Sequence, residues 1–123
     1  MKISCGVDII EIERVKESIQ SIGDAFLERV YTKSEIEYCE SKKMQKYQHY
    51  AARFAAKEAA FKALSEEVRD KYLISWKDIE VLNDCNGRPR LNILNKDIKI
   101  ESIDISISHC KEYAVANVVV LKD

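Results

Sequence analysis

The chain opens with hydrophobic residues at every second position. Within the first eight residues they fall at Ile3, Cys5 and Val7. A period of two is typical of a strand with one buried face. We therefore expect a strand that buries these three side chains and ends at Asp8.

From about residue 10 the hydrophobic spacing lengthens to three or four residues. This spacing predicts an amphipathic helix, and its hydrophobic stripe consists of Ile12, Val15, Ile19 and Ile22. Gly23 follows directly and is a typical helix-ending residue. Asp8 therefore lies where the strand passes into the helix.

Two more helices are predicted before the middle of the chain. Thr32 and Glu35 have the spacing of a capping box, which favours a helix over about residues 33–41 with Ile36 and Cys39 facing inward. A longer helix is expected over about residues 47–64. Ser65 then fits the cap of a short helical segment over residues 66–73.

The second half of the chain reads mainly as strands. Asn86-Gly87 is typical of a two-residue hairpin turn, and Pro89 is tolerable near the start of a strand or at a sheet edge. The expected extended segments are residues 75–82, 88–94, 103–109 and 113–121. Sequential hairpins after a helical first half favour an α+β fold, in which helices cover an antiparallel sheet.

Composition limits the architecture and the kind of partner. The chain has 123 residues, of which 46% are hydrophobic and 33% are charged, with one Pro and three Gly. This length and composition predict one globular domain over residues 1–123. Twenty Lys and Arg balance twenty-one Asp and Glu, so no overall basic field favours nucleic acid.

Cysteine spacing and hydrophobic run length indicate the compartment. Cys5, Cys39, Cys85 and Cys110 are widely separated and include no CxxC pair, which gives poor support to a zinc site or a disulfide framework. No secretory signal is recognisable, and the longest apolar runs are far below the ~20 residues of a membrane-spanning helix. We expect a cytoplasmic protein that does not enter a membrane.

The helix around residues 53–64 has an unusual charged face. Its alanines share one sector, whereas Phe54 and Phe61 fall among the charges on the other side. A Glu58–Lys62 ion pair is the structural interpretation and is worth ~0.2–0.5 kcal/mol. The functional interpretation is a site for phosphate and a divalent ion. Carboxylate oxygens are suitable ligands for Mg²⁺, and cationic side chains neutralise phosphate. The charges concerned are Arg53, Lys57, Glu58 and Lys62.

Asp8 adds a second carboxylate to this hypothesis. Its structural interpretation is an N-cap for the helix that follows. Its functional interpretation is a second metal ligand, since Mg²⁺ takes one or two protein carboxylates together with substrate phosphates and water.

Six segments together resemble one family, the holo-acyl-carrier-protein synthases, which are the small type of 4′-phosphopantetheinyl transferase. In chain order they are GVDIIEIER, FLERVYTKSEIEYC, RFAAKEAAFKAL, SWKDIEV, NGRPRL and SISHCKEYAVANVVV. The resemblance covers most of the chain and implies the fold of that family. It also implies Mg²⁺-dependent transfer of 4′-phosphopantetheine from coenzyme A to a serine of apo acyl carrier protein, which releases adenosine 3′,5′-bisphosphate.

The resemblance also assigns roles to individual residues. It implies that Asp8 and Glu58 hold Mg²⁺ and that Lys62 binds phosphate. Arg53 and His109 match positions that hold the nucleotide with its 3′-phosphate. For His109 the alternative is a hydrogen bond to the turn backbone. The sequence does not decide whether the general base is a metal-bound water or a carboxylate.

Carrier docking and assembly follow from the same resemblance. Arg14 matches the docking arginine for the acidic helix of a carrier protein, and its alternative is a solvated helix charge. The family often has further arginines after this helix, where this chain has IQSIGDAF, so Lys16 and Arg29 would have to contribute. Family members form trimers with active sites between neighbouring subunits, and we expect a homotrimer here.

A second departure follows the long helix. Relatives commonly continue as KALGTG, whereas this chain has Ser65-Glu66-Glu67. Glycine lets backbone N–H groups approach phosphate, whereas glutamates repel it unless they turn away. A catalytically silent module that binds carrier proteins or nucleotides is therefore the alternative function. A third hypothesis is a nucleotide pyrophosphohydrolase that uses the same two carboxylates.

Overall fold

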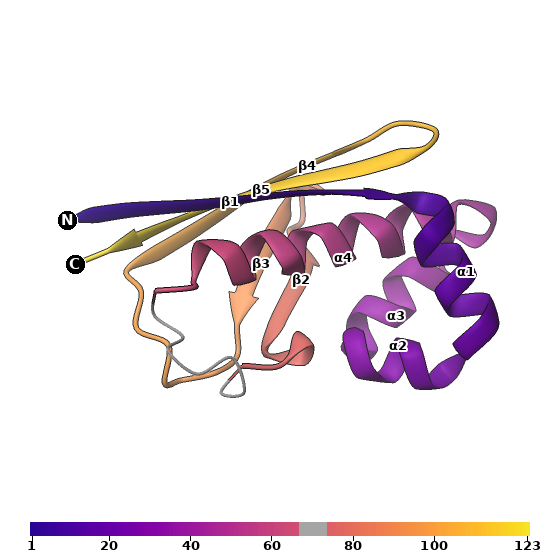
Figure 1. Ribbon diagram of the computed structural model, residues 1–123, viewed down its shortest axis with the longest axis horizontal. Coiled ribbons are helices and arrows are strands. Elements are labelled where there is room, and N and C mark those ends of the chain that lie inside the picture. The colour runs from indigo at the N-terminus through magenta and orange to yellow at the C-terminus, as the bar shows by residue number, and fades with distance from the viewer. Residues whose placement is uncertain (67–73) are drawn as a thin grey trace.

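The chain begins with a strand, continues through successive helices and ends in successive strands, as Figure 1 shows. Our computed structural model describes residues 1–66 and 74–123. The expected helical segment over residues 66–73 lies outside the described residues except for Glu66. Among the described residues the elements are β1 (Lys2–Glu11), α1 (Ile12–Ile22), α2 (Asp24–Val30), α3 (Lys33–Glu40), the 3₁₀ turn η1 (Lys43–Gln45), α4 (Lys46–Ala63), the 3₁₀ turn η2 (Trp76–Asp78), β2 (Ile79–Asn83), β3 (Pro89–Ile93), β4 (Ser102–His109) and β5 (Tyr113–Lys122).

The strands form two antiparallel sheets, which confirms the α+β prediction. One has the order β1-β5-β4 and the other is the β2-β3 hairpin. β1 does not end at Asp8 as predicted, because its backbone keeps pairing with β5 as far as Glu11, opposite Tyr113. Asp8 therefore lies inside the strand, opposite Ala116. The N-cap of α1 is Glu11, so the capping role considered for Asp8 is wrong.

α4 runs along one face of the three-stranded sheet (Figure 1). Its small side chains allow close packing against β1 and β5, and Ala55, Ala56, Ala59, Ala60 and Ala63 are all buried. Gly6 of β1 lies directly against the helix, since a Cβ atom there would overlap the Ala59 carbonyl oxygen. The sheet and the helix are therefore in contact at the level of their backbones.

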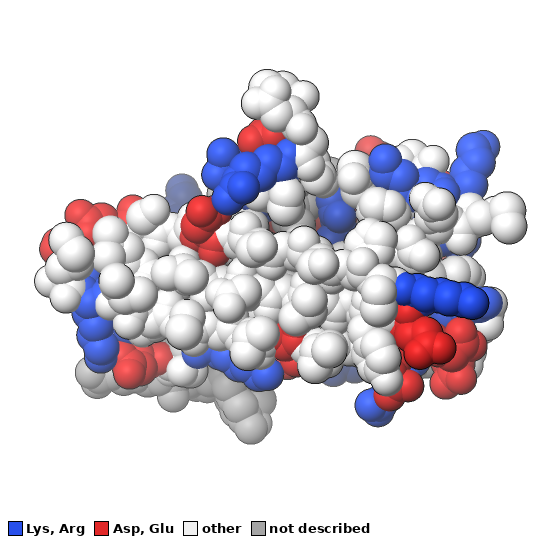
Figure 2. Space-filling model, turned by 90° about the horizontal axis from the view of Figure 1, so that it is seen from above, with Lys and Arg blue, Asp and Glu red and all other residues white. Residues whose placement is uncertain are grey.

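This close packing reverses the predicted orientation of β1. Ile3, Val7 and Ile9 are 67%, 54% and 64% exposed, whereas Gly6 is buried. The alternation correctly predicted a strand, but the face that it predicted to be buried is the exposed one. Only the face with the smaller residue fits against α4, so the larger side chains point away from the core. On the outer face of the sheet they form a largely uncharged surface (Figure 2).

The helical end of the molecule follows the sequence prediction more closely. Ile12, Val15 and Ile19 are buried in a second hydrophobic cluster, but Ile22 is 58% exposed because α1 ends there. Gly23 has φ 77° and donates its N–H to the Ile19 carbonyl, as expected of a helix-ending glycine. α2 was not predicted.

Local signals in the remaining segments were partly correct. Thr32 and Glu35 form the predicted capping box at the start of α3, and Cys39 is buried. The β2-β3 turn is longer than two residues and spans residues 84–88, because the Asp84 carboxylate accepts the N–H groups of Asn86 and Arg88. Gly87 has φ 83° in this turn. Within residues 1–66 and 74–123, no helix is both long and apolar enough to cross a membrane.

Candidate active site

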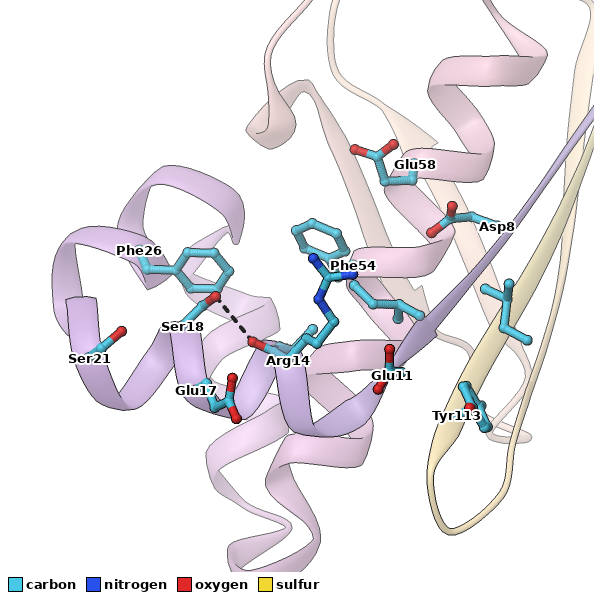
Figure 3. A pocket seen from close by; sticks show the side chains of 13 residues that line it. Asp8, Glu11, Arg14, Glu17, Ser18, Ser21, Phe26, Phe54, Glu58 and Tyr113 are labelled. Carbon is cyan, nitrogen blue, oxygen red and sulfur yellow. Dashed lines mark hydrogen bonds between the residues drawn. The ribbon is translucent and has the colours of Figure 1, made fainter.

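A groove of about 750 Å³ lies between β1, α1 and α4. Asp8 and Glu58 both line it, together with Arg14 and the ring of Phe54. Figure 3 shows the two carboxylates near each other, with Glu17, Ser18 and Ser21 at the far side of the groove. The structure therefore brings together two acidic residues that are fifty positions apart in the sequence.

Lys62 connects the two elements that carry these carboxylates. It lies one turn beyond Glu58 on α4, and its Nζ lies 2.8 Å from the Val7 carbonyl oxygen and 3.3 Å from Asp8 Oδ1. The ammonium group thus binds to β1, which differs from the simple intrahelical pair with Glu58. Because its side chain is 54% exposed, it can also meet an anion that approaches from solvent.

The electrostatic state of Glu58 reflects this environment. Partial burial raises the pKa of its carboxyl above the usual value, repulsion from Asp8 raises that pKa further, and Lys62 opposes both effects. A carboxylate that is destabilised by a second carboxylate gains from a shared cation. Two oxygen donors fit Mg²⁺, which commonly takes its other ligands from substrate phosphates and water. Among the described residues, no third acidic, His or Cys side chain completes a purely protein site.

Lys57 does not belong to the charged groove face. Its ammonium is fully buried and donates to the Val30 carbonyl at 2.6 Å, Glu35 Oε1 at 2.7 Å and the Trp76 carbonyl at 3.0 Å. Glu35 also accepts the Val81 N–H at 2.8 Å. The grouping of Lys57 with the phosphate-facing charges is therefore wrong. Lys57 joins α4 to the helical end of the molecule and, through Glu35, to the β2-β3 hairpin.

The two phenylalanines on α4 face a tryptophan from a distant segment. The Phe54 ring stacks on Trp76 at 4.9 Å, and the Phe61 ring meets the same indole edge-on at 5.1 Å. Phe54 also stacks on Phe26 at 6.4 Å and forms part of the groove wall. The aromatic residues among the α4 charges thus hold the helix in place beside the groove.

Arg53 and His109 lie in a different place from the groove. Five residues of α-helix turn through about 500°, so Arg53 and Glu58 point roughly 140° apart. The Arg53 guanidinium packs 4.1 Å from the Tyr38 ring of α3, and its Nη2 donates to Asn83 Oδ1 at 2.7 Å. His109 ends β4, and its ring lies 6.2 Å from that of His49. A single copy of the chain therefore divides the candidate site residues between the groove and a second region.

Comparison with known proteins decides the family. The model of the 4′-phosphopantetheinyl transferase superfamily matches residues 4–118. The chain is 44% identical to the holo-[acyl-carrier-protein] synthase of Ruminiclostridium cellulolyticum, over 98% of this chain and 92% of that protein. It belongs to this superfamily.

Solved structures of phosphopantetheinyl transferases have the same fold. The Helicobacter pylori holo-[acyl-carrier-protein] synthase in complex with coenzyme A matches with a TM-score of 0.83 and 33% identity, over 94% of this chain and 98% of that one. A Chronobacterium ammoniagenes complex of the synthase with coenzyme A matches with a TM-score of 0.85 and 28% identity, over 100% and 99% of the two chains. The resemblance predicted from the six sequence segments is confirmed.

Glu66, in the segment that departs from the transferase pattern after α4, pairs with two lysines of the sheet. The Glu66 carboxylate lies 2.6 Å from Lys2 Nζ and 3.1 Å from Lys122 Nζ, and these two bonds lower its pKa. Glu66 is thus held at the end of the sheet where the two chain termini meet. Its charge is neutralised locally, so one of the two glutamates is turned to partners within the chain. Glu67 lies outside the described residues.

Arg14 is the docking candidate that lines the groove, where its side chain lies beside Phe54 (Figure 3). Lys16 is placed differently, with its ammonium 5.5 Å from the centroid of the Tyr47 ring. Arg29 is exposed in the last turn of α2. The three basic residues named from the sequence therefore do not form one continuous strip on α1.

Sequence reasoning missed three residues that shape the transferase site. Gly6 permits the contact between β1 and α4, Trp76 supports both phenylalanines, and Glu35 holds Lys57. The capping box identified Glu35 only as a local helix signal. Gly6 could have been suspected from a glycine inside a strand, which often marks a close backbone approach. No local pattern marks Trp76.

Proposed function

We propose that this chain is a holo-[acyl-carrier-protein] synthase. It transfers 4′-phosphopantetheine from coenzyme A to a serine of an apo acyl carrier protein. The serine hydroxyl gives up its proton to a general base, its oxygen forms a bond to the β-phosphorus, the bond from that phosphorus to the bridging oxygen breaks, and adenosine 3′,5′-bisphosphate leaves. The observation that carries the proposal is the meeting of Asp8 and Glu58 in one groove, with Lys62 bound to Asp8, in a chain from this family.

In this proposal Asp8 and Glu58 hold Mg²⁺. When bound there, the ion would supply positive charge to the pyrophosphate and to the leaving oxygen. Lys62, fixed to the backbone of β1, places a further positive charge beside the same phosphates. The transfer of a phosphoryl-type group depends mainly on such positioning and charge neutralisation. Arg14, on the groove wall beside this site, is the proposed contact for an acidic carrier protein.

We also propose a homotrimer with active sites between neighbouring copies. Two observations support it. Arg53 and His109 do not line the groove that holds Asp8 and Glu58, and a site shared between two copies would bring both groups to one coenzyme A. In addition, exposed hydrophobic side chains of β1 and β5, including Ile3, Val7, Ile9 and Val119, leave the outer sheet face uncovered, which is typical of a protein interface.

The direct test is mass spectrometry of an apo acyl carrier protein incubated with coenzyme A, Mg²⁺ and the enzyme. We expect the carrier to gain one phosphopantetheine group with the wild type. The gain should disappear with Asp8→Asn or Glu58→Gln and persist with Glu37→Gln, which removes an exposed carboxylate of α3. Coenzyme A binding without a modified carrier would instead identify a silent binding module. Release of adenosine bisphosphate without an acceptor would identify a pyrophosphohydrolase.

Shared sites can be tested by co-expressing two inactive variants, Asp8→Asn and Arg53→Gln. In a randomly mixed trimer, about a quarter of the interfaces combine an intact Asp8 with an intact Arg53 of the neighbour. Activity should therefore return to about a quarter of the wild-type value. A mixture that stays inactive, although both variants assemble, would show that each site is built from one copy.

A further inference from the structure

The chain has two histidines, and the fold brings them together. His49 lies in the first turn of α4 and His109 at the end of β4, and their ring centroids are 6.2 Å apart. His49 is half-buried and His109 is exposed. Figure 1 shows the start of α4 and the β4-β5 turn at the same end of the molecule. The family resemblance implies that His109 holds the nucleotide but gives His49 no role.

Three groups that oppose protonation of His49 come from different parts of the chain. Lys42 follows α3, Arg53 lies one turn further along α4, and His109 comes from β4; each of these charges acts against protonation of His49. The neutral ring of Tyr38 packs edge-on against His49 at 5.5 Å and also lies under the Lys42 and Arg53 cations at 4.8 Å and 4.1 Å. Burial and these like charges together lower the pKa of His49 below 6.5.

Arg53 gives independent support for an anion at this place. Its residue is only 4% exposed, so its guanidinium has lost most of its hydration. Nη2 is satisfied by Asn83, but within residues 1–66 and 74–123 the buried Nε has no acceptor. Buried polar groups are almost always hydrogen-bonded, and an orphaned one suggests a partner that binds from outside.

We propose that His49 is a third side chain of the 3′-phosphate site, beside Arg53 and His109, and that its imidazole takes up a proton when the phosphate dianion binds. The inference rests on the proposed function, because it adds a residue and a proton to the nucleotide site. A phosphate placed among these groups reverses the local field. The neighbouring cations then oppose protonation of His49 less, and the anion favours it.

The sign of the pH dependence follows from linkage. Binding raises the pKa of His49, so the bound protein carries more protons than the free protein at pH values between the two. Affinity for the 3′-phosphate is greatest below the pKa of His49 in the free protein. It falls as the pH rises between that pKa and the pKa of the complex, and it is lowest above the pKa of the complex. Each unit of pKa increase corresponds to about a tenfold loss of affinity across this interval.

Nuclear magnetic resonance of the imidazole protons tests this in the intact wild-type protein. Two histidines give two titrating signals, which a His49→Gln variant assigns. Adenosine 3′,5′-bisphosphate should raise the pKa of His49 by about one unit, whereas adenosine 5′-monophosphate, which lacks the 3′-phosphate, should leave it nearly unchanged. An equal effect of both ligands, or no effect of either, would overturn the inference.

Calorimetry in buffers of different ionisation enthalpy gives a second measurement. Wild type should take up protons on binding adenosine 3′,5′-bisphosphate, His49→Gln should take up fewer, and Gln48→Ala, a change in the same turn of α4, should match the wild type. Because the ligand phosphate itself titrates near pH 6, the difference between variants carries the result. Equal uptake by His49→Gln and the wild type would refute the role of His49.

The outcomes separate this inference from the proposed function. Normal transfer to the carrier protein by the wild type, with a His49 pKa that ignores the 3′-phosphate, contradicts the inference alone. A His49 pKa that responds to the 3′-phosphate in a protein that transfers nothing contradicts the transferase proposal alone.

Discussion

Gly6→Ala tests whether contact between β1 and α4 sets the geometry of the active site. The added Cβ would overlap the Ala59 carbonyl oxygen and lie 2.8 Å from Ala63 N and 2.9 Å from Lys62 Cβ. These are backbone atoms or atoms next to the backbone, so no side-chain rotation can relieve the clash. To restore ordinary contacts of about 3.5 Å, the strand and helix must separate by more than about 1 Å.

The expected loss has a stability part and a catalytic part. Overpacking of this kind costs about 1–3 kcal/mol. The same displacement moves Lys62 and Glu58 on α4 away from Asp8 on β1, and a 1 Å error in a positioned site can cost about 100-fold in rate. We therefore expect activity to fall by about two orders of magnitude at temperatures where the variant is still folded.

The measurements are the thermal midpoint and the rate of carrier modification at saturating Mg²⁺ and coenzyme A. Gly87→Ala is the matched control, because it makes the same change at φ 83° in the distant β2-β3 turn, where no atom lies within 4 Å of the new Cβ. It should lose about 1 kcal/mol through backbone strain and keep its rate. Wild-type stability and rate in Gly6→Ala would refute the argument.

Two further predictions concern charges at and near the site. Lys57→Met leaves the Glu35 carboxylate buried without its ammonium partner and should lower the free energy of unfolding, measured by chemical denaturation, by about 3–5 kcal/mol. Adding Glu35→Gln should recover part of that loss. A smaller loss in the single variant would contradict the buried pairing. Because burial and Asp8 raise the pKa of Glu58 in the folded state, its contribution to stability falls as the pH rises through 4.5 and then through that raised pKa. Glu58→Gln should therefore raise the melting temperature of the metal-free protein near neutral pH, with a gain that disappears toward about pH 4; a gain independent of pH would point to another cause.

Local sequence signals predicted most of the secondary structure. The capping box at Thr32, the helix stop at Gly23 and the stripe from Ile12 to Ile19 depend on residues a few positions apart, so the chain carries them without reference to its tertiary fold. The ordered motifs also predicted the family, which the comparisons confirmed. The roles of Asp8, Glu58, Lys62, Arg53 and His109 stay proposals.

Tertiary structure decided the features that depend on contacts between distant segments. An alternating strand has two faces, and only the close approach of α4 to Gly6 determines that Ile3 and Val7 point outward. A lysine on a helix can face solvent or the core, and the position of Lys57 follows from Glu35 and from carbonyl groups brought in by other segments. The sequence by itself determined most of the elements and the family they belong to. Packing determined which side of each element is buried and which charges meet, because these depend on atoms that are neighbours only in the folded chain.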